Sequence, residues 1–350
     1  MTVPWATSSD PIGLDLGQRP WCAAQWASMA GTRRPWRLTT IGTPGPLEPM
    51  TLEGAAQLRQ ELKRTGFVGR DVIVAPPEAL LMSSIMELPS ASVGVPTAQL
   101  ARMEMGRLHN CEPGSFEMAC WTLPRPARAA NTDLVMATAC RCDLADALLD
   151  ALEGAGLRVR ALRSRSAGLI RACRDLLDPI VGMAGLLDVT MEQARLSLLY
   201  AGAVVYERTI PNAEGEVMVK ALAQTAGQEA NEVRAALLEG RWNESPSHGK
   251  GHKGSDTQDP VRLYTQALIE GARLPLTYAS NQYPDTPIEA MFVTGLAAAA
   301  PAICQMLAGA CPCPVRPVLP ADLTTESAPD RPDGYELPQL TAAIGLGARE

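Results

Sequence analysis

Two aspartates stand where short apolar runs end, and they are the residues of this sequence best suited to chemistry. They lie in the segments Asp15–Gly17 and Asp188–Thr190. A carboxylate at the end of a buried strand, followed by a tight turn, is how an α/β protein presents an acid to a metal-bound phosphate. Each aspartate could instead cap its strand by accepting hydrogen bonds from backbone amides. The pattern is short, so its repetition is what favours a phosphate-binding role.

The cysteines and histidines do not form a convincing metal site. The closely spaced cysteines are the C-x-C pairs Cys140–Cys142 and Cys311–Cys313, whereas structural zinc sites use C-x-x-C knuckles. His248 and His252 lie in a segment rich in glycine and lysine. That segment also lacks the preceding strand and the following helix of a phosphate loop. We therefore expect buried or incidental thiols, a solvated loop and no bound metal.

Composition excludes several classes of protein. The chain has 350 residues, 31 basic and 38 acidic side chains, and a net charge of −7. An acidic chain is a poor nucleic-acid binder, because phosphate binding needs clustered lysine and arginine. Nine cysteines, an odd number, favour a reducing cytoplasm over a disulfide framework. Residues 1–11 contain no basic side chain and no apolar core, so we expect no secretory signal.

One uncharged stretch, Ala290–Val315, has to be weighed as a membrane span. It is rich in alanine, glycine and proline, whereas a spanning helix needs about 20 predominantly apolar residues. The pattern favours a strand at Ala290–Val293, a turn at Thr294–Gly295 and a helix beginning near Pro301, where proline is preferred. We expect no direct membrane insertion.

Hydrophobic periodicity predicts an α/β chain whose opening pattern recurs. The first half begins with strands at 12–16 and 21–26, and the second with strands at 185–189, 194–200 and 204–210. Further strands are predicted at 71–75, 80–88, 116–123, 134–139, 290–293 and 315–318. Helices are predicted at 52–65, 97–109, 143–154, 166–177, 216–225, 230–242 and 260–280, from 301 onward, and at 337–346.

These pieces, in this order, resemble the PilM family of actin-like cytoplasmic proteins of type IV pilus assembly, which is similar to the cytoplasmic part of type II secretion GspL. The resemblance rests on the order and spacing of its anchors over about 330 residues rather than on one motif. The anchors are Gly13–Gly17, Glu87–Pro89, Asp133–Gly156, Leu187–Ile210, Phe292–Ile303 and Leu340–Arg349.

The resemblance implies an α/β fold of the actin/Hsp70-like (ribonuclease H-like) type, with duplicated halves around a nucleotide cleft and a small inserted α/β subdomain. It places the first half at 1–67 and 141–182, and the insert at 68–140. The second half is expected at 183–336, with a disordered insertion at 243–259, and a C-terminal helix at 337–350 is expected to pack on the first half. A PilN-like inner-membrane partner would place its cytoplasmic tail in a groove near Leu80–Leu88 and Thr97–His109.

The departures from the family pattern fall in all three nucleotide loops. In the first loop, Gln18 and Cys22 stand where the family has a serine and a lysine. In the second, Val189–Gln193 replaces a glycine and small hydroxyl residues, and Glu192 adds a negative charge where the anion would lie. Two like charges about 4 Å apart repel by roughly 4 kcal/mol at an effective dielectric constant near 20. In the third loop, Leu296 and Ala297 replace glycines.

We therefore expect a vestigial nucleotide site at Asp15, Gly17, Asp188, Thr190, Thr294 and Gly295, with no catalytic residue and no required cofactor. The expected function is a non-catalytic, pseudo-ATPase scaffold of a type IV pilus or type II-like secretion assembly, peripheral to the inner membrane through its partners. Homo-oligomers and contacts with other assembly proteins fit that role. The alternative is an active ATPase or small-molecule kinase that uses Asp15 and Asp188 to hold Mg-ATP. A filament former of the FtsA kind would need a basic amphipathic tail, and Leu337–Glu350 has one basic residue.

Overall fold

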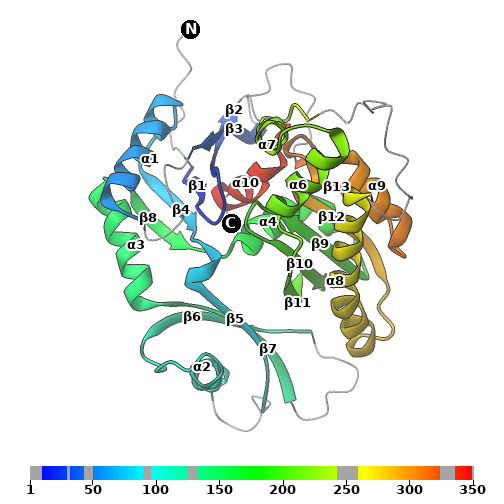
Figure 1. Ribbon diagram of the computed structural model, residues 1–350. Coiled ribbons are helices and arrows are strands. Elements are labelled where there is room, and N and C mark those ends of the chain that lie inside the picture. The colour runs from blue at the N-terminus through cyan, green and yellow to red at the C-terminus, as the bar shows by residue number, and fades with distance from the viewer. Residues whose placement is uncertain are drawn as a thin grey trace. The chain divides into compact units, whose positions relative to one another are not determined.

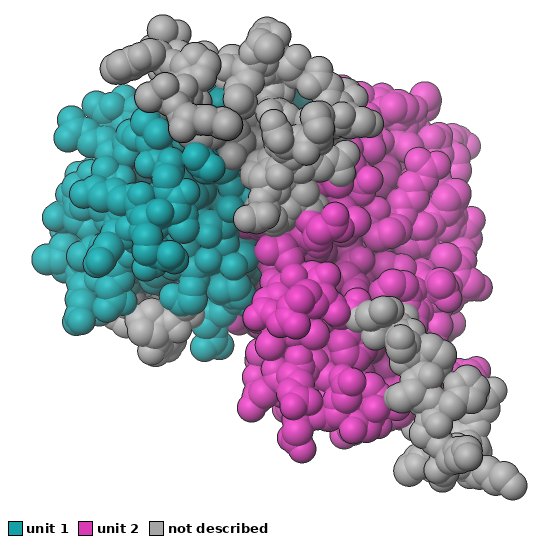
Figure 2. Space-filling view, turned by 90° about the horizontal axis from the view of Figure 1, so that it is seen from above, with its two compact units in different colours: residues 1–174, 328–333, 342–350 teal, residues 175–327, 334–341 magenta. Residues whose placement is uncertain are grey.

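The computed structural model describes residues 10–29, 32–42, 50–89, 96–124, 132–242, 259–323 and 336–348. The chain divides into two units (Figure 2). Unit 1 contains residues 1–174, 328–333 and 342–350, and unit 2 contains residues 175–327 and 334–341. The insertion predicted at 243–259 lies outside the described residues, except for Asp259.

Unit 1 is built on a five-stranded sheet with the order β3-β2-β1-β4-β8 (Figure 1). Its strands are β1 Ile12–Asp15, β2 Trp21–Met29, β3 Thr32–Ile41, β4 Asp71–Ala75 and β8 Arg158–Leu162. Strand β1 is antiparallel to β2 and parallel to β4, and β4 is parallel to β8. Because β1, β4 and β8 are parallel, their carboxyl ends meet at one edge of the sheet, where such folds place their ligands.

Helices cover both faces of this sheet. Helices α1 (Leu52–Arg64) and α3 (Cys142–Gly154) pack their apolar faces on β1 and β4. Thr51 caps α1, because its hydroxyl oxygen accepts a hydrogen bond from the backbone amide of Gly54 at 3.1 Å. Helix α10 (Thr341–Gly347) lies against β1 at Gly13, where an added Cβ would collide with α10 backbone. Coverage on both faces explains why β1 is buried along its length.

A second, three-stranded sheet in unit 1 has the order β5-β7-β6. It consists of β5 Leu81–Pro89, β6 Phe116–Thr122 and β7 Thr132–Arg141, all antiparallel. Helix α2 (Thr97–Leu108) covers one face, where Met105 packs with Phe116 and Val135 (Figure 1).

Unit 2 repeats the strand order of the first sheet. Its order is β11-β10-β9-β12-β13, with β9 Met183–Val189, β10 Ala194–Tyr200, β11 Ala203–Ile210, β12 Ile288–Gly295 and β13 Val315–Pro317. Strand β9 is antiparallel to β10 and parallel to β12, as β1 is to β2 and β4. Its core is shared with the helices α6 Gly215–Ala226, α7 Ala230–Leu238, α8 Pro260–Gln282 and α9 Pro301–Ala310. The predicted duplication of an α/β half is confirmed.

Several elements differ from the sequence prediction. Strands β3 and β8 were not predicted. The helix predicted at 166–177 is two helices, α4 Arg165–Ala172 and α5 Arg174–Leu177, separated at Cys173. Helix α7 ends at Leu238, because Gly240 adopts a φ of +64° that stops it. No helix among the described residues is long and apolar enough to cross a membrane. Ala290–Val315 contains the predicted strand and helix, but Thr294–Gly295 are the last residues of β12 rather than a turn, and a 3₁₀ helix at Leu296–Ala299 follows them.

Candidate functional site

Asp15 is the last residue of β1, and its side chain is fully buried at 0% exposure. The strand's direction continues for one more residue, since the amide of Leu16 donates to the carbonyl of Ala75 at 2.9 Å. The chain then turns, and the amide of Gly17 donates to Asp15 Oδ1 at 3.1 Å. Sequence reasoning therefore placed this carboxylate correctly at the end of a buried strand, with the glycine turn beside it.

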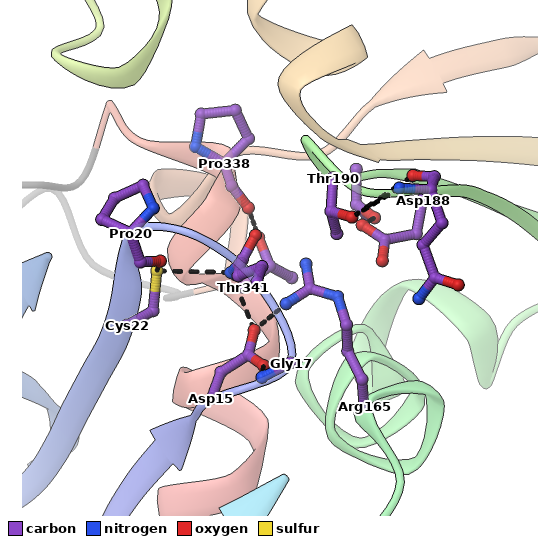
Figure 3. A network of polar contacts seen from close by, with 12 residues as sticks. Asp15, Gly17, Pro20, Cys22, Arg165, Asp188, Thr190, Pro338 and Thr341 are labelled. Carbon is purple, nitrogen blue, oxygen red and sulfur yellow. Dashed lines mark hydrogen bonds and ion pairs between the residues drawn. The ribbon is translucent and has the colours of Figure 1, made fainter. Parts of the chain in front are cut away.

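Arg165 supplies the charge that balances Asp15. Its Nη1 forms an ion pair with Asp15 Oδ2, and Arg165 is only 1% exposed (Figure 3). Arg165 is the first residue of α4, which follows β8, and Ser164 caps this helix by accepting from the amide of Ala167 at 3.2 Å. The two charges meet because β1 and β8 both end at the same edge of the sheet.

Gln18 occupies the second oxygen of the same carboxylate. Its Nε2 lies 2.7 Å from Asp15 Oδ2 and 3.3 Å from the sulfur of Cys22. The Cys22 thiol in turn lies 3.6 Å from the carbonyl oxygen of Pro20 (Figure 3). Gln18 and Cys22, the two residues that depart from the family pattern in this loop, therefore contact each other, and Gln18 also binds Asp15.

This arrangement does not fit a magnesium ion at Asp15. Mg²⁺ requires carboxylate oxygens at about 2.1 Å in octahedral geometry, and here both oxygens accept hydrogen bonds or an ion pair. A divalent cation about 4 Å from the guanidinium would be repelled by roughly 8 kcal/mol at an effective dielectric constant near 20. The Asp15–Arg165 pair is already neutral, so the carboxylate has no charge left to compensate a metal ion.

In unit 2, Asp188 is hydrogen-bonded to the end of β12. The hydroxyl of Thr294 donates to Asp188 Oδ1 at 3.0 Å, and the two residues are direct neighbours in the β9–β12 register. Gly295 has a φ of +65°, and an added Cβ would lie 2.9 Å from the same carboxylate oxygen. Glycine is therefore required here by both the left-handed backbone and the close approach.

Two backbone amides of the turn after Asp188, those of Thr190 and Gln193, are bound within the turn itself. The amide of Thr190 donates to the carbonyl of Gln193 at 2.8 Å, and the amide of Gln193 donates to the Thr190 hydroxyl at 3.2 Å (Figure 3). The first amides of α6 are also used, because Gly215 donates to the carbonyl of Thr190 at 2.8 Å. A helix N-terminus binds a phosphate through such amides when they are free, so this one offers little to an anion.

The third loop is packed into the core of unit 2. After Gly295 the chain forms a short 3₁₀ helix, Leu296–Ala299, in which Leu296 and Ala297 are buried among apolar side chains of that core. The leucine side chain lies against α6, where it would meet a Cβ added to Gly215 at 2.7 Å. These two residues fill space that glycines would leave open.

The structure thus brings the predicted residues into two clusters, each described within its own unit. Asp15 and Gly17 form one, and Asp188, Thr190, Thr294 and Gly295 form the other. Sequence reasoning missed Arg165. A signal was available: a cation in the first turn of a helix is disfavoured by the helix dipole, so an arginine directly after a serine cap indicates a buried acidic partner.

The cysteines form no disulfides. Among the described residues, no three histidine, cysteine, aspartate or glutamate side chains gather closely enough to hold a metal ion. Burial raises the pKa of the Cys140, Cys311 and Cys313 thiols above the ordinary value, so these side chains favour the neutral, unreactive form. His248 and His252 lie outside the described residues.

No family model matches the sequence, and no curated protein matches it. Solved structures do match. A chain of a PilM–PilN type IV pilus biogenesis complex has a TM-score of 0.72 and 19% identity, over 97% of each chain. The ethanolamine utilization protein EutJ from Carboxydothermus hydrogenoformans has a TM-score of 0.53 and 12% identity, over 99% of this chain and 92% of that chain. The cytoplasmic domain of EpsL, an inner membrane component of the type II secretion system of Vibrio cholerae, has a TM-score of 0.38 and 12% identity, over 60% of this chain and 74% of that chain. This likeness is weak.

The chain therefore has the actin-like fold, and the resemblance to PilM stated from the sequence is confirmed at the level of the fold. At 19% identity the likeness concerns architecture alone.

Proposed function

We propose that this chain is a non-catalytic, actin-like scaffold of a type IV pilus or type II-like secretion assembly. In this role it binds the cytoplasmic tail of a PilN-like inner-membrane protein and lies at the cytoplasmic side of that membrane through its partners. The observation that carries the proposal is a PilM-like fold along nearly the whole chain in which Asp15 is already neutralised by Arg165.

The nucleotide site is degenerate in this proposal. Three loops support it: Gln18 binds Asp15 and Cys22 in the first, the amides of Thr190 and Gln193 bind within the turn after Asp188, and Leu296 fills the third. Asp15, Gly17, Asp188, Thr190, Thr294 and Gly295 are then structural remnants of a nucleotide site, and Mg-ATP binding is weak or lost.

The partner's tail would bind on the three-stranded sheet of unit 1. Ile85, Met136 and Trp121 form a row across β5, β7 and β6, because each is the direct register partner of the next. Side chains alternate between the two faces of a strand. Met86 in β5 and Val135 in β7 pack against α2, and they directly adjoin Ile85 and Met136 in sequence. The row therefore lies on the face of the sheet opposite to α2. Trp121 is 37% exposed. An exposed tryptophan in line with a buried methionine and a half-buried isoleucine is a typical anchor for an apolar peptide.

The remaining parts of the proposal follow the family's organisation. The insert expected at 68–140 begins only after β4 in this proposal, because Asp71–Ala75 is a strand of the five-stranded sheet, and the insert contains the three-stranded sheet. Residues 1–67 and 141–182 form the first half together with β4, 183–336 form the second, and 337–350 return to the first half. Homo-oligomers and contacts with other assembly proteins are part of the same role.

The test is direct binding of peptides that correspond to the short cytoplasmic tails of single-span inner-membrane proteins encoded beside this chain. We expect one such peptide to bind the purified full chain equally well with and without Mg-ATP. A working ATPase or kinase instead predicts ATP turnover that Asp15→Ala abolishes, and turnover of that kind would replace the scaffold proposal.

A further inference from the structure

The carboxylate of Asp15 is occupied by three donors that come from two distant parts of unit 1. The amide of Gly17 and the side-chain amide of Gln18 come from the loop after β1, and the guanidinium of Arg165 comes from α4. A buried carboxylate needs such donors and a countercharge, because an uncompensated charge in the interior is unstable. Here the countercharge belongs to the protein itself.

Arg165 stands in a position that its helix alone would not favour. It is the first residue of α4, where the partial positive charge of the helix N-terminus disfavours a cation. Its side chain is nevertheless almost completely buried. The ion pair with Asp15 offsets both penalties, so the arginine and the aspartate stabilise each other.

Helix α4 is also held in place so that the guanidinium stays at the carboxylate. Gly168, one turn after Arg165, contacts α10 so closely that an added Cβ would lie 2.8 Å from the carbonyl oxygen of Ala342 and 3.0 Å from Leu346. The contact is mutual, because a Cβ on Gly345 would collide with the backbone of Gly168. Moving Arg165 away from Asp15 by shifting α4 would therefore require α10 to move as well.

We propose that Arg165 is a resident counter-cation that takes the place of a divalent metal ion at Asp15 and excludes such an ion from it. This inference rests on the proposed function. It explains how a scaffold that does not bind nucleotide keeps the buried carboxylate of Asp15 compensated. The site would regain affinity for a divalent cation if the guanidinium were removed, because the carboxylate would be left buried and uncompensated.

The experiment measures Mn²⁺ binding by electron paramagnetic resonance and the Mg²⁺ dependence of the melting temperature in the full chain. Four proteins are compared: the wild type, Arg165→Gln, Asp15→Asn and the double variant Asp15→Asn/Arg165→Gln. A matched control is Arg160→Gln, which removes an exposed arginine that pairs with Asp71 in the same unit.

We expect the wild type and the control to bind no more Mn²⁺ than Asp15→Asn does, because none of these three proteins should have a metal site at position 15. Arg165→Gln should bind Mn²⁺ at least about tenfold more tightly, its melting temperature should rise with Mg²⁺, and both gains should disappear in the double variant. Mn²⁺ binding by the wild type that Asp15→Asn removes would overturn the proposal. So would an Arg165→Gln variant that folds and gains no Mn²⁺ binding.

If Arg165→Gln is unfolded without metal, its recovery supplies the answer. Folding restored by Mg²⁺ during purification supports the proposal, whereas folding restored only by the second substitution, Asp15→Asn, contradicts it. The outcome is separable from that of the proposed function, because tail-peptide binding by the wild type is measured without metal and does not depend on any of these variants.

Discussion

Gly168 in α4 and Gly345 in α10 are in backbone contact: a Cβ on Gly345 would collide with the carbonyl oxygen of Gly168 and lie 2.7 Å from the amide nitrogen of Ala172. Two helices approach this closely only where both have no side chain at the contact. Helix α10 lies near the end of the chain and α4 follows β8, so this contact fastens the C-terminal segment to unit 1. It also fixes the helix that begins with Arg165.

Gly345→Ala should destabilise the protein through this contact. Over-packing of a tight interior site costs about 1–3 kcal/mol or more, so we expect a clear loss of the free energy of unfolding in urea. The control is Gly309→Ala in α9, where an added Cβ meets nothing within 4 Å. That substitution should leave stability unchanged or raise it by about 0.5–1 kcal/mol. Equal effects of the two substitutions would contradict the packing that we describe.

The Asp15–Arg165 pair should behave as one unit in a double-mutant cycle. Asp15→Asn or Arg165→Gln alone leaves one buried charge without its partner, which costs about 3–5 kcal/mol. The double variant keeps polar groups of similar size and no charge, so we expect it to be more stable than either single variant. Urea denaturation measures the three differences, and strictly additive losses would show that the two charges do not interact.

Trp121→Lys should weaken binding of the partner's tail peptide without affecting folding. Aromatic anchors of interfaces commonly contribute about 2 kcal/mol or more, which corresponds to roughly a 30-fold loss of affinity. Fluorescence anisotropy of a labelled peptide measures the change. The matched control is Val181→Lys, an apolar side chain that is 86% exposed in unit 2. A peptide whose affinity responds equally to both substitutions would not be bound by the Ile85–Met136–Trp121 row.

Asp71 provides a pH-dependent contribution to stability. Hydrogen bonds and charge from Arg158, and to a smaller degree from Arg160, hold the pKa of Asp71 below its ordinary value. A lowered pKa in the folded state means that the stabilisation is complete above the unfolded pKa, near 4, and is lost as the pH falls through the folded pKa. The arginines are about half exposed, so Asp71→Asn should cost at most about 1 kcal/mol at neutral pH. The difference from the wild type should vanish in acid, and a difference that grows in acid would contradict this assignment.

The sequence predicted the elements that position the two aspartates, because those strands are continuous apolar runs that end in a polar residue. It did not predict β8, in which Arg158 and Arg160 interrupt the apolar pattern of a five-residue edge strand. It did not predict β3 either, since residues 32–41 contain three arginines and a proline. The sequence of β3 or β8 alone does not reveal that a neighbouring strand of the sheet, β2 or β4, supplies its backbone hydrogen-bond partners.

The candidate site shows the same limit. The loss of a hydroxyl and a lysine at Gln18 and Cys22 could be recognised from the chain, and so could the bulk of Leu296. The partner of Asp15 could not be identified, because Arg165 lies 150 positions away and is one of four arginines in the segment 158–165. The parallel arrangement of β1, β4 and β8 is what brings Arg165, among these four arginines, to the carboxylate of Asp15.

Isothermal titration of the wild-type chain with Mg-ATP decides whether the nucleotide site is degenerate. We expect no heat of binding at millimolar nucleotide, because Asp15 is neutralised by Arg165 and the amides of Thr190 and Gln193 bind within the turn after Asp188. The same sample should bind its partner's tail peptide, which shows that the protein is folded and active as a scaffold. A micromolar dissociation constant for Mg-ATP would contradict the degenerate site and, with it, the assignment of this chain as a non-catalytic scaffold.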